Sequence, residues 1–305
     1  MTFGNHLPSG YPPLPSLKRS LWAPRTLFST FMNWVVFACV ALALLPLLAV
    51  LIYVVAQGLT RINLDSFTKL PPPPMVPGGG FGNAILGTAI MVGIGMLISV
   101  PFGVLAAVYL SEFSSGKIAE WTRFATNVLS GVPSIIVGVF AYAVIVLDPL
   151  GLIGYKGYSA WAGGFALSIL MLPIIVRTTD EALKLVPQEL RQASIGLGAT
   201  SFQTVFGVVL PAAIPAILTG VTLAVARAAG ETAPLLFTAL FTQFWPNWGN
   251  GLFEPTASLS VLVFNFAIVP FKNQQELAWA ASLILVLLVL LTSIISRIAT
   301  AKRVY

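Results

Sequence analysis

The chain has 305 residues, of which 57% are hydrophobic and only 9% are charged, and its formal net charge is +6. Soluble domains carry about 25% charged residues, so this composition excludes a soluble protein and predicts an integral membrane protein. The one cysteine (Cys39) and the one histidine (His6) exclude an intrachain disulfide and do not suffice for a zinc or haem site. We therefore expect no metal site, and no basic run indicates nucleic-acid binding.

The apolar runs determine the expected organisation, because a spanning helix needs about 20 apolar residues. Six runs qualify, at residues 32–57, 84–110, 128–147, 160–176, 212–240 and 279–295. Residues 256–271 are also apolar, but they are short and closed by Pro270, which favours an interfacial or re-entrant helix over a seventh span. The expected fold class is an all-α integral membrane protein with about six transmembrane helices.

Lysine and arginine residues predict the orientation of these spans. One set of tails and loops holds ten of them: Lys18, Arg19, Arg25, Lys117, Arg123, Lys184, Arg191, Arg297, Lys302 and Arg303. The alternate loops hold four: Arg61, Lys69, Lys156 and Lys272. The positive-inside bias therefore predicts cytoplasmic tails at 1–31 and 298–305 around a membrane domain at 32–297. The first span is expected to be a signal anchor rather than a cleaved signal peptide.

Small residues recur at every fourth position in two spans, which predicts close helix packing. The second span carries Gly95, Ser99, Gly103, Ala107 and Ser111, and the fifth carries Gly220, Ala224, Ala228 and Thr232.

The third span contains the sequence SGVPSIIVG, residues 130–138. Pro133 lacks an N–H group and disfavours helix at Val132. A backbone break at membrane depth is tolerated where it contacts protein or a water-lined cavity, so Ser134 is a candidate residue of a transport pathway. A simple kink near the helix start is the alternative interpretation.

The segment 180–211 is polar, yet its sequence predicts two short helices. Pro187 suits a first helical turn, and Gly196 and Gly198 suit a helix end. Thr200 and Gln203 form the pattern of a capping box that begins the next helix. A capped pair of helices projecting from a membrane bundle indicates a docking surface, and an ordinary structured loop is the alternative.

Within this segment, QASIGLGATSFQTVFGVVLP resembles the EAA loop of ABC-importer permeases. Both spacings of that motif match without a gap, at Gln192, Ala193, Ser194, Gly198, Leu210 and Pro211. The family usually has Glu at the place of Gln192, so a salt bridge there is in doubt. The resemblance implies a type I ABC-importer permease fold, in which this loop couples a separate ATPase to the membrane helices.

The chain has no phosphate-binding loop of its own, because its one Gly-Lys pair, Gly116-Lys117, is followed by Ile118 and lacks the upstream glycine. We therefore expect no enzymatic activity and no cofactor on this chain, with ATP and Mg²⁺ bound by a partner ATPase.

A second resemblance suggests the substrate. The sequence ARAAGETAPLLFTAL, residues 226–240, is similar to the A-type permeases of phosphate-specific transport systems, as are segments before the second span and around 130–138 and 176–193. This resemblance implies an inorganic phosphate importer in a bacterial inner membrane. Its implied partners are a second permease, two ATPase subunits and a periplasmic phosphate-binding protein.

Arg227 and Glu231 interrupt the fifth apolar span and are four residues apart, which places them on one face of a helix. A charge at the bilayer centre costs roughly 2.5–3.5 kcal/mol, and an arginine fork suits phosphate oxygens. By the resemblance, Arg227 and Arg177 correspond to arginines that matter for phosphate passage. The alternatives are a structural ion pair for Arg227 and a snorkelling side chain for Arg177.

The helix is expected to be weak beside this pair, because Pro234 lacks an N–H for the carbonyl of Gly230. We therefore hypothesise a switch in which Glu231 holds Arg227 until phosphate competes for it. Two other functions stay open: a permease for another oxyanion such as sulfate or molybdate, and a gated anion channel. An intramembrane enzyme is disfavoured, because Glu231 is the one acidic residue well inside a span and His6 lies in the tail.

Overall fold

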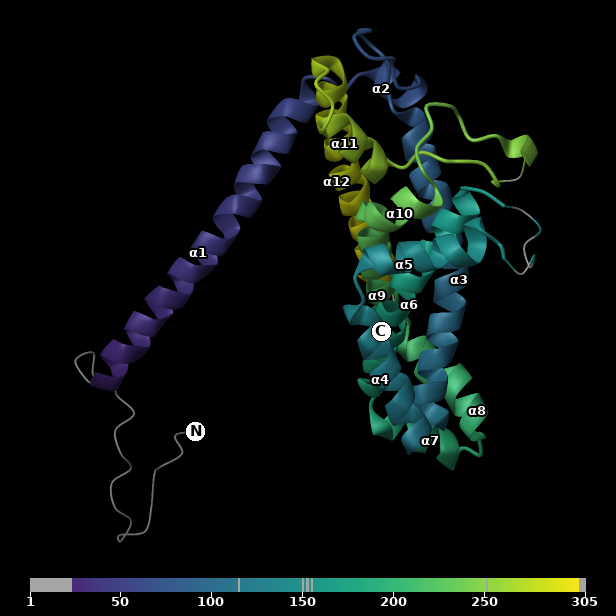
Figure 1. Cartoon of the computed structure of the whole chain (residues 1–305). Helices are drawn as coiled ribbons and strands as arrows, with labels where there is room; N and C mark the ends of the chain where they lie inside the picture. Colours follow the sequence, from purple (N-terminus) through teal and green to yellow (C-terminus); the bar gives the residue numbers. More distant parts are fainter. Residues whose placement is uncertain are drawn as a thin grey trace. The chain divides into compact units, whose positions relative to one another are not determined.

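The computed structural model describes residues 24–114, 116–149, 151, 154, 156–250 and 252–301, so residues 1–23 and 302–305 of the expected tails lie outside it. The regular elements of this part are all helical (Figure 1). In chain order they are α1 (Pro24–Leu59), α2 (Leu64–Thr68), α3 (Gly82–Val108), η1 (Tyr109–Phe113), α4 (Lys117–Gly131), α5 (Ser134–Ala141), η2 (Tyr142–Val146), α6 (Ala160–Lys184), α7 (Gln188–Gly196), α8 (Ser201–Thr204), η3 (Val205–Val209), α9 (Leu210–Gly230), α10 (Ala233–Thr238), η4 (Trp248–Asn250), α11 (Leu259–Ala267) and α12 (Lys272–Ala301).

The chain divides into two units, residues 1–53 and 54–305. The described part of the first unit is the larger share of α1, an apolar helix that continues through Pro46 without a break. It begins at Pro24 rather than at residue 32, so the helix extends about two turns further toward the N-terminus than the predicted span.

The core of the second unit is formed by α3, α6 and α9, with α6 packed against both of the others. The predicted small-residue faces make these contacts. A Cβ on Gly103 of α3 would lie 2.8 Å from Cγ2 of Ile175 in α6, and a Cβ on Gly220 of α9 would overlap Thr178. Ala107 and Ala224 are fully buried. The close approach of three backbones confirms the predicted packing role of these positions.

A second core joins α11 and α12 to the start of α3, through Phe81, Leu259, Leu262 and Leu277. In the segment 256–271 the structure has one helix, α11, of nine residues. At 1.5 Å per residue this helix is only about 14 Å long, which is less than a bilayer core. The expected short helix is therefore present, and it is not a seventh span.

The described residues contain five helices that are long and apolar enough to cross a membrane, and six candidate spans when the bent pair α4 and α5–η2 counts as one. The span predicted over 128–147 is divided between two helices, because α4 and α5 meet at 100° across Val132 and Pro133, where the sequence predicts a break. Val132 is extended, with ψ 130°, as expected for a residue before proline. The span predicted to end at 176 continues to Lys184, and the last span runs through all of α12.

Candidate functional site

The segment that resembles an EAA loop forms a helical turn and a new helix, as its sequence predicts. Helix α7 ends at Gly196, and Gly198 has a φ of +89°, a left-handed conformation that glycine adopts without strain. Thr200 and Gln203 make both halves of a capping box. From Ser201 the chain is helical through α8, η3 and α9 to Gly230, so the capped turn leads directly into a membrane helix.

The motif residues lie at different depths in this region. Gln192 and Ala193 are exposed on α7, whereas Ser194 is half-buried, with its hydroxyl 3.0 Å from that of Thr204. Leu210 is half-buried and Pro211 is exposed in the first turn of α9, where proline does not interrupt the helix. The two ends of the motif therefore lie on separate helices that a neutral hydrogen bond connects.

The first residues of the expected loop belong to the bundle instead. Asp180–Lys184 form the last turns of α6, and Asp180 is buried. Its carboxylate accepts hydrogen bonds from Arg123 of α4, at 3.3 Å, and from Lys184. The burial of the carboxylate between two cations explains why this polar stretch remains helical and packed.

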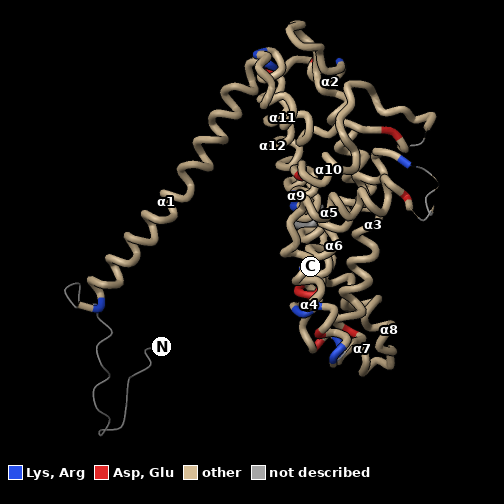
Figure 2. Tube along the Cα trace, in the orientation of Figure 1, with Lys and Arg blue, Asp and Glu red and all other residues tan. Residues whose placement is uncertain are grey.

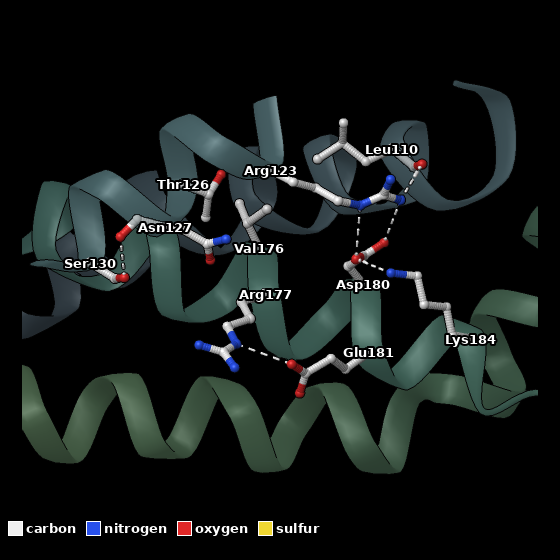
Figure 3. Close-up of a pocket in the computed structure, with 10 residues that line it drawn as sticks. All are labelled: Leu110, Arg123, Thr126, Asn127, Ser130, Val176, Arg177, Asp180, Glu181 and Lys184. Carbon is white, nitrogen blue, oxygen red and sulfur yellow. Dashed lines mark hydrogen bonds and ion pairs between the residues drawn. The ribbon is translucent and has the colours of Figure 1, made fainter. Parts of the chain in front are cut away.

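An open cavity of about 530 Å³ lies between α4 and α6. Its charged lining residues are Arg123, Arg177, Asp180, Glu181 and Lys184. Figure 3 shows two separate groups: Asp180 joins Arg123 and Lys184, whereas Arg177 turns away with Glu181. Figure 2 shows that acidic and basic residues gather where α4 and α7 lie.

Arg177 lies in the interior of α6 rather than at the end of a span. Its Nε donates to Oε1 of Glu181 at 3.0 Å, and the two side chains are 65% and 60% exposed. An exposed pair four residues apart on a helix contributes little to stability. Both groups are therefore available to a ligand or a partner at the surface of this chain.

Arg227 lies in the last turn of α9, and Glu231 caps that helix. The prediction of one helix over 212–240 is wrong, because Glu231 is extended, with φ −71° and ψ 131°, and a new helix, α10, begins at Ala233. The ion pair is nevertheless made, with Nε of Arg227 3.4 Å from Oε1 of Glu231. The side chain of Arg227 is 49% exposed and that of Glu231 is 16% exposed.

The helix ends there for two reasons. Pro234 lacks the N–H that would bond the carbonyl of Gly230, as the sequence predicts. In addition, the hydroxyl of Ser260 in α11 donates to the carbonyl of Glu231 at 2.7 Å, which satisfies a backbone group outside the helix. The expected weak point is thus a complete break that a second segment of the chain stabilises.

The two broken helices of the chain meet at this place, because α10 packs on α5 (Figure 1). A Cβ on Gly138 of α5 would lie 2.7 Å from Cα of Pro234, so the backbones touch. Ser134 is the first residue of α5 and is half-buried. The expected pathway residues are not gathered in one pocket, since the cavity between α4 and α6 has Arg177 in its lining but not Arg227, Glu231 or Ser134.

Several polar contacts are absent from the sequence-based predictions. Arg123 with Asp180 is one, and Arg191 with Glu112, at 2.8 Å, is another. The two residues of the first pair are 57 positions apart in the sequence and those of the second are 79 apart, so no local pattern indicates such pairs. In the described part of the chain, no three His, Cys, Asp or Glu side chains are grouped as metal ligands.

The comparisons with known proteins agree with this architecture. Residues 99–304 match the family described as binding-protein-dependent transport system inner membrane component. The phosphate transport system permease protein PstA of Yersinia pestis is 41% identical over 258 residues, which cover 84% of this chain and 84% of that protein. PstA of Pasteurella multocida (strain Pm70) is 40% identical over 275 residues, which cover 90% and 95% of the two chains.

Among solved structures, a chain of a bacterial alginate ABC transporter, in complex with an alginate pentasaccharide-bound periplasmic protein, has a TM-score of 0.61. Its sequence identity is 16%, and the match covers 89% of this chain and 96% of the other. The fold is therefore that of an ABC-importer permease, a multi-pass membrane protein. The chain belongs to the binding-protein-dependent transport system inner membrane component family, and within it to the PstA phosphate transport permeases.

Proposed function

We propose that this chain is one of two permease subunits of an ATP-driven importer of inorganic phosphate, and that it forms half of the translocation pathway. The observation that carries the proposal is Arg227, a half-exposed guanidinium in the last turn of a membrane helix, next to a backbone break. The relatives that share the sequence of this chain are named phosphate transport permeases, which supports phosphate as the substrate.

The chemistry of Arg227 suits this role. A guanidinium stays charged at any physiological pH and offers a planar set of donors to the oxygens of an anion. At membrane depth such a group is costly, by roughly 2.5–3.5 kcal/mol, and a structural ion pair is often replaceable by apolar residues at little cost. Arg227 therefore serves anion passage rather than the stability of the bundle.

Glu231 is the residue that controls Arg227 in this proposal. One hydrogen bond of 3.4 Å, from Nε of Arg227, joins the two, and four of the five guanidinium N–H groups lie on the other two nitrogens, which can bind an anion. In the empty state Glu231 holds Arg227, and an arriving phosphate competes for it. A site shared in this way binds phosphate weakly, as transit requires.

The exposed arginines support a pathway that a second permease subunit completes. Arg177 and Arg227 are 65% and 49% exposed on this chain, so a facing subunit would enclose them. We propose a paralogue as that subunit, together with a periplasmic phosphate-binding protein that delivers the substrate. Ser134, at the break before α5, is a further proposed contact of the pathway.

Two copies of a separate ATPase complete the proposed transporter and bind ATP and Mg²⁺. The capped turn formed by α7 and α8 is the proposed docking element. Its exposed apolar side chains include Ile195, Leu197 and Phe202, which are 56%, 91% and 61% exposed. Such side chains at a membrane protein's polar end fit an apolar cleft on a partner. We place this end, and both termini, in the cytoplasm of a bacterial cell on the basis of the positive-inside bias.

The test is transport by the complete transporter in proteoliposomes, with ATP on the ATPase side and the loaded binding protein on the other. Labelled phosphate should accumulate only with ATP, and excess sulfate or molybdate should not compete. Competition by sulfate or molybdate would assign another oxyanion. Phosphate flux without ATP would assign a gated anion channel.

A further inference from the structure

The coupling helix α7 is attached to the bundle without an apolar core. Among its nine residues, all of which the structure describes, none is buried. Only Arg191 and Ser194 are half-buried, and the other seven are exposed. Because burial of apolar side chains is the main force that holds helices together in water, polar contacts must fix the position of α7.

Arg191 makes most of these contacts. Its Nη1 donates to the carbonyl of Val186 at 2.6 Å, and its Nη2 donates to the carbonyl of Leu183 at 2.9 Å and to Oε1 of Glu112 at 2.8 Å. Leu183 lies in the last turn of α6 and Val186 lies two residues beyond its end, where a cation is favoured by the helix dipole. One side chain thus joins α7 to α6 and to the end of α3.

The ion pair between Arg191 and Glu112 is largely shielded from water. The side chains of Arg191 and Glu112 are 14% and 10% exposed. A pair withdrawn from water is rigid when its hydrogen bonds are complete, and removal of one partner leaves an uncompensated charge. By contrast, Ser194 joins α7 to Thr204 of the following helix through one neutral hydrogen bond of 3.0 Å. The stronger attachment of α7 is therefore to α3 and α6.

The turn that holds Glu112 also receives a second arginine. Glu112 lies in η1, directly after α3, and the carbonyl of Leu110 in the same turn accepts from Nη2 of Arg123 at 3.0 Å. Arg123 belongs to α4 and also pairs with Asp180 of α6. Through η1, the position of α7 is linked to that of α4, which leads to the break at Pro133.

We propose that Arg191 is a positioning residue that fixes the coupling helix α7 to α3 and α6, so that a displacement of α7 by the ATPase moves these helices as one body. Glu112 is its carboxylate acceptor, and the carbonyls of Leu183 and Val186, at and just after the end of α6, are its other two acceptors. The inference rests on the proposed function, because it concerns how ATP hydrolysis by the ATPase is coupled to movement of the helices that line the pathway. A purely structural ion pair would stabilise the chain without affecting the ratio of ATP hydrolysed to phosphate transported.

The experiment compares Glu112→Gln with Glu120→Gln in the complete reconstituted transporter. Glu120 is an exposed carboxylate on α4, so its variant makes the same chemical change outside the joint. Hydrogen–deuterium exchange of residues 188–196 should become at least about tenfold faster in Glu112→Gln, since the helix loses its charged anchor. The ATP hydrolysed per phosphate should rise by about threefold or more. Glu120→Gln should change neither quantity.

A second variant, Arg191→Lys, keeps the charge but lacks the fork that reaches three acceptors. It should show the same two changes to a smaller extent, with the ATPase still co-purifying. Unchanged exchange of α7, or faster exchange with an unchanged ATP-to-phosphate ratio, would overturn the inference. If the wild-type transporter itself fails to accumulate phosphate with ATP, the proposed function fails instead, and the exchange measurement still decides whether Arg191 fixes α7.

Discussion

Two Arg–Glu pairs of this chain differ in how deeply they are buried and in how far apart their residues lie in the sequence. Arg191 and Glu112 are almost buried, come from segments 79 residues apart, and are 2.8 Å from each other, with two further carbonyls on the guanidinium. Arg227 and Glu231 are four residues apart, 3.4 Å from each other and half open to the surroundings on the arginine side. The first pair joins three helices, whereas the second joins neighbours across one break.

The difference shows how burial decides the use of the same two residue types. A buried pair is costly to open, because each partner left alone is an unsolvated charge. In the second pair the arginine is 49% exposed and one hydrogen bond of 3.4 Å joins it to Glu231, so a competing anion can reach the guanidinium and replace the carboxylate. One pair is therefore suited to holding helices together, and the other to releasing its arginine during transport.

The largest expected effect is on stability, and it separates the two arginines directly. Arg191→Gln should lower the free energy of unfolding by about 3–5 kcal/mol, because it leaves Glu112 buried without a partner. Arg227→Gln, the matched control, should lower it by less, about 1–2 kcal/mol, because the half-exposed Arg227 makes one long hydrogen bond to Glu231, which is itself 16% exposed. Denaturant titration of the purified chain in detergent micelles measures both. Equal destabilisation by the two variants would contradict the comparison.

The next largest effect concerns transport, for which substitution of Arg227, rather than of Arg191, is expected to have the greater direct effect. Arg227→Gln should reduce phosphate uptake by roughly 100-fold, because a charged hydrogen bond to the anion contributes about 1.5–3 kcal/mol. Labelled phosphate uptake by the complete transporter at saturating ATP gives the value. Normal uptake by a correctly assembled Arg227→Gln transporter would exclude Arg227 from the pathway.

Glu231→Gln tests the release step, with a smaller expected effect of about tenfold. Loss of the competing carboxylate should strengthen phosphate retention on Arg227 or allow ATP hydrolysis without transport. Filter binding of labelled phosphate and the ATPase rate are the two measurements. If both match the wild type, Glu231 is a plain counter-charge rather than a gate.

Substitution of Arg177 is expected to have the smallest effect on both stability and phosphate uptake among the arginines compared. Arg177→Gln removes an exposed pair with Glu181, so stability should change by at most about 0.5 kcal/mol. Phosphate uptake should fall by about threefold to tenfold, because Arg177 lines the cavity between α4 and α6 at the polar end. A stability loss like that of Arg191→Gln would show that Arg177 is structural.

Local signals in the sequence predicted much of the fold. The capping box at Thr200 and Gln203, the turn at Gly198 and the break at Pro133 depend on neighbouring residues alone, and all three are present. The small-residue face of α3 also predicted its packing, because Gly103 allows a close approach wherever a partner helix lies. Such features need no knowledge of the rest of the chain.

Features that depend on distant segments were not predictable in this way. The end of α9 is stabilised by Ser260, 29 residues beyond Glu231, whose hydroxyl donates a hydrogen bond to the carbonyl of Glu231. The pairs of Arg191 and Arg123 require that α3, α4 and α6 have already packed. The resemblance to a family supplied the EAA-like segment and the arginines proposed for the pathway, whereas the contacts that hold α7 are visible in the tertiary structure alone.

The continuous helix from Ser201 to Gly230 has a mechanical consequence. It contains 30 residues, so it is about 45 Å long. Its capped base lies in the turn proposed as the docking element, and its far end holds Arg227 beside the break. A rod of this length acts as a lever: a tilt of about 10° at the base displaces the tip by about 8 Å. That distance exceeds the diameter of a phosphate ion, so a small rotation at the base, if an ATPase docks there as proposed, is geometrically sufficient to open or close a passage at the other end.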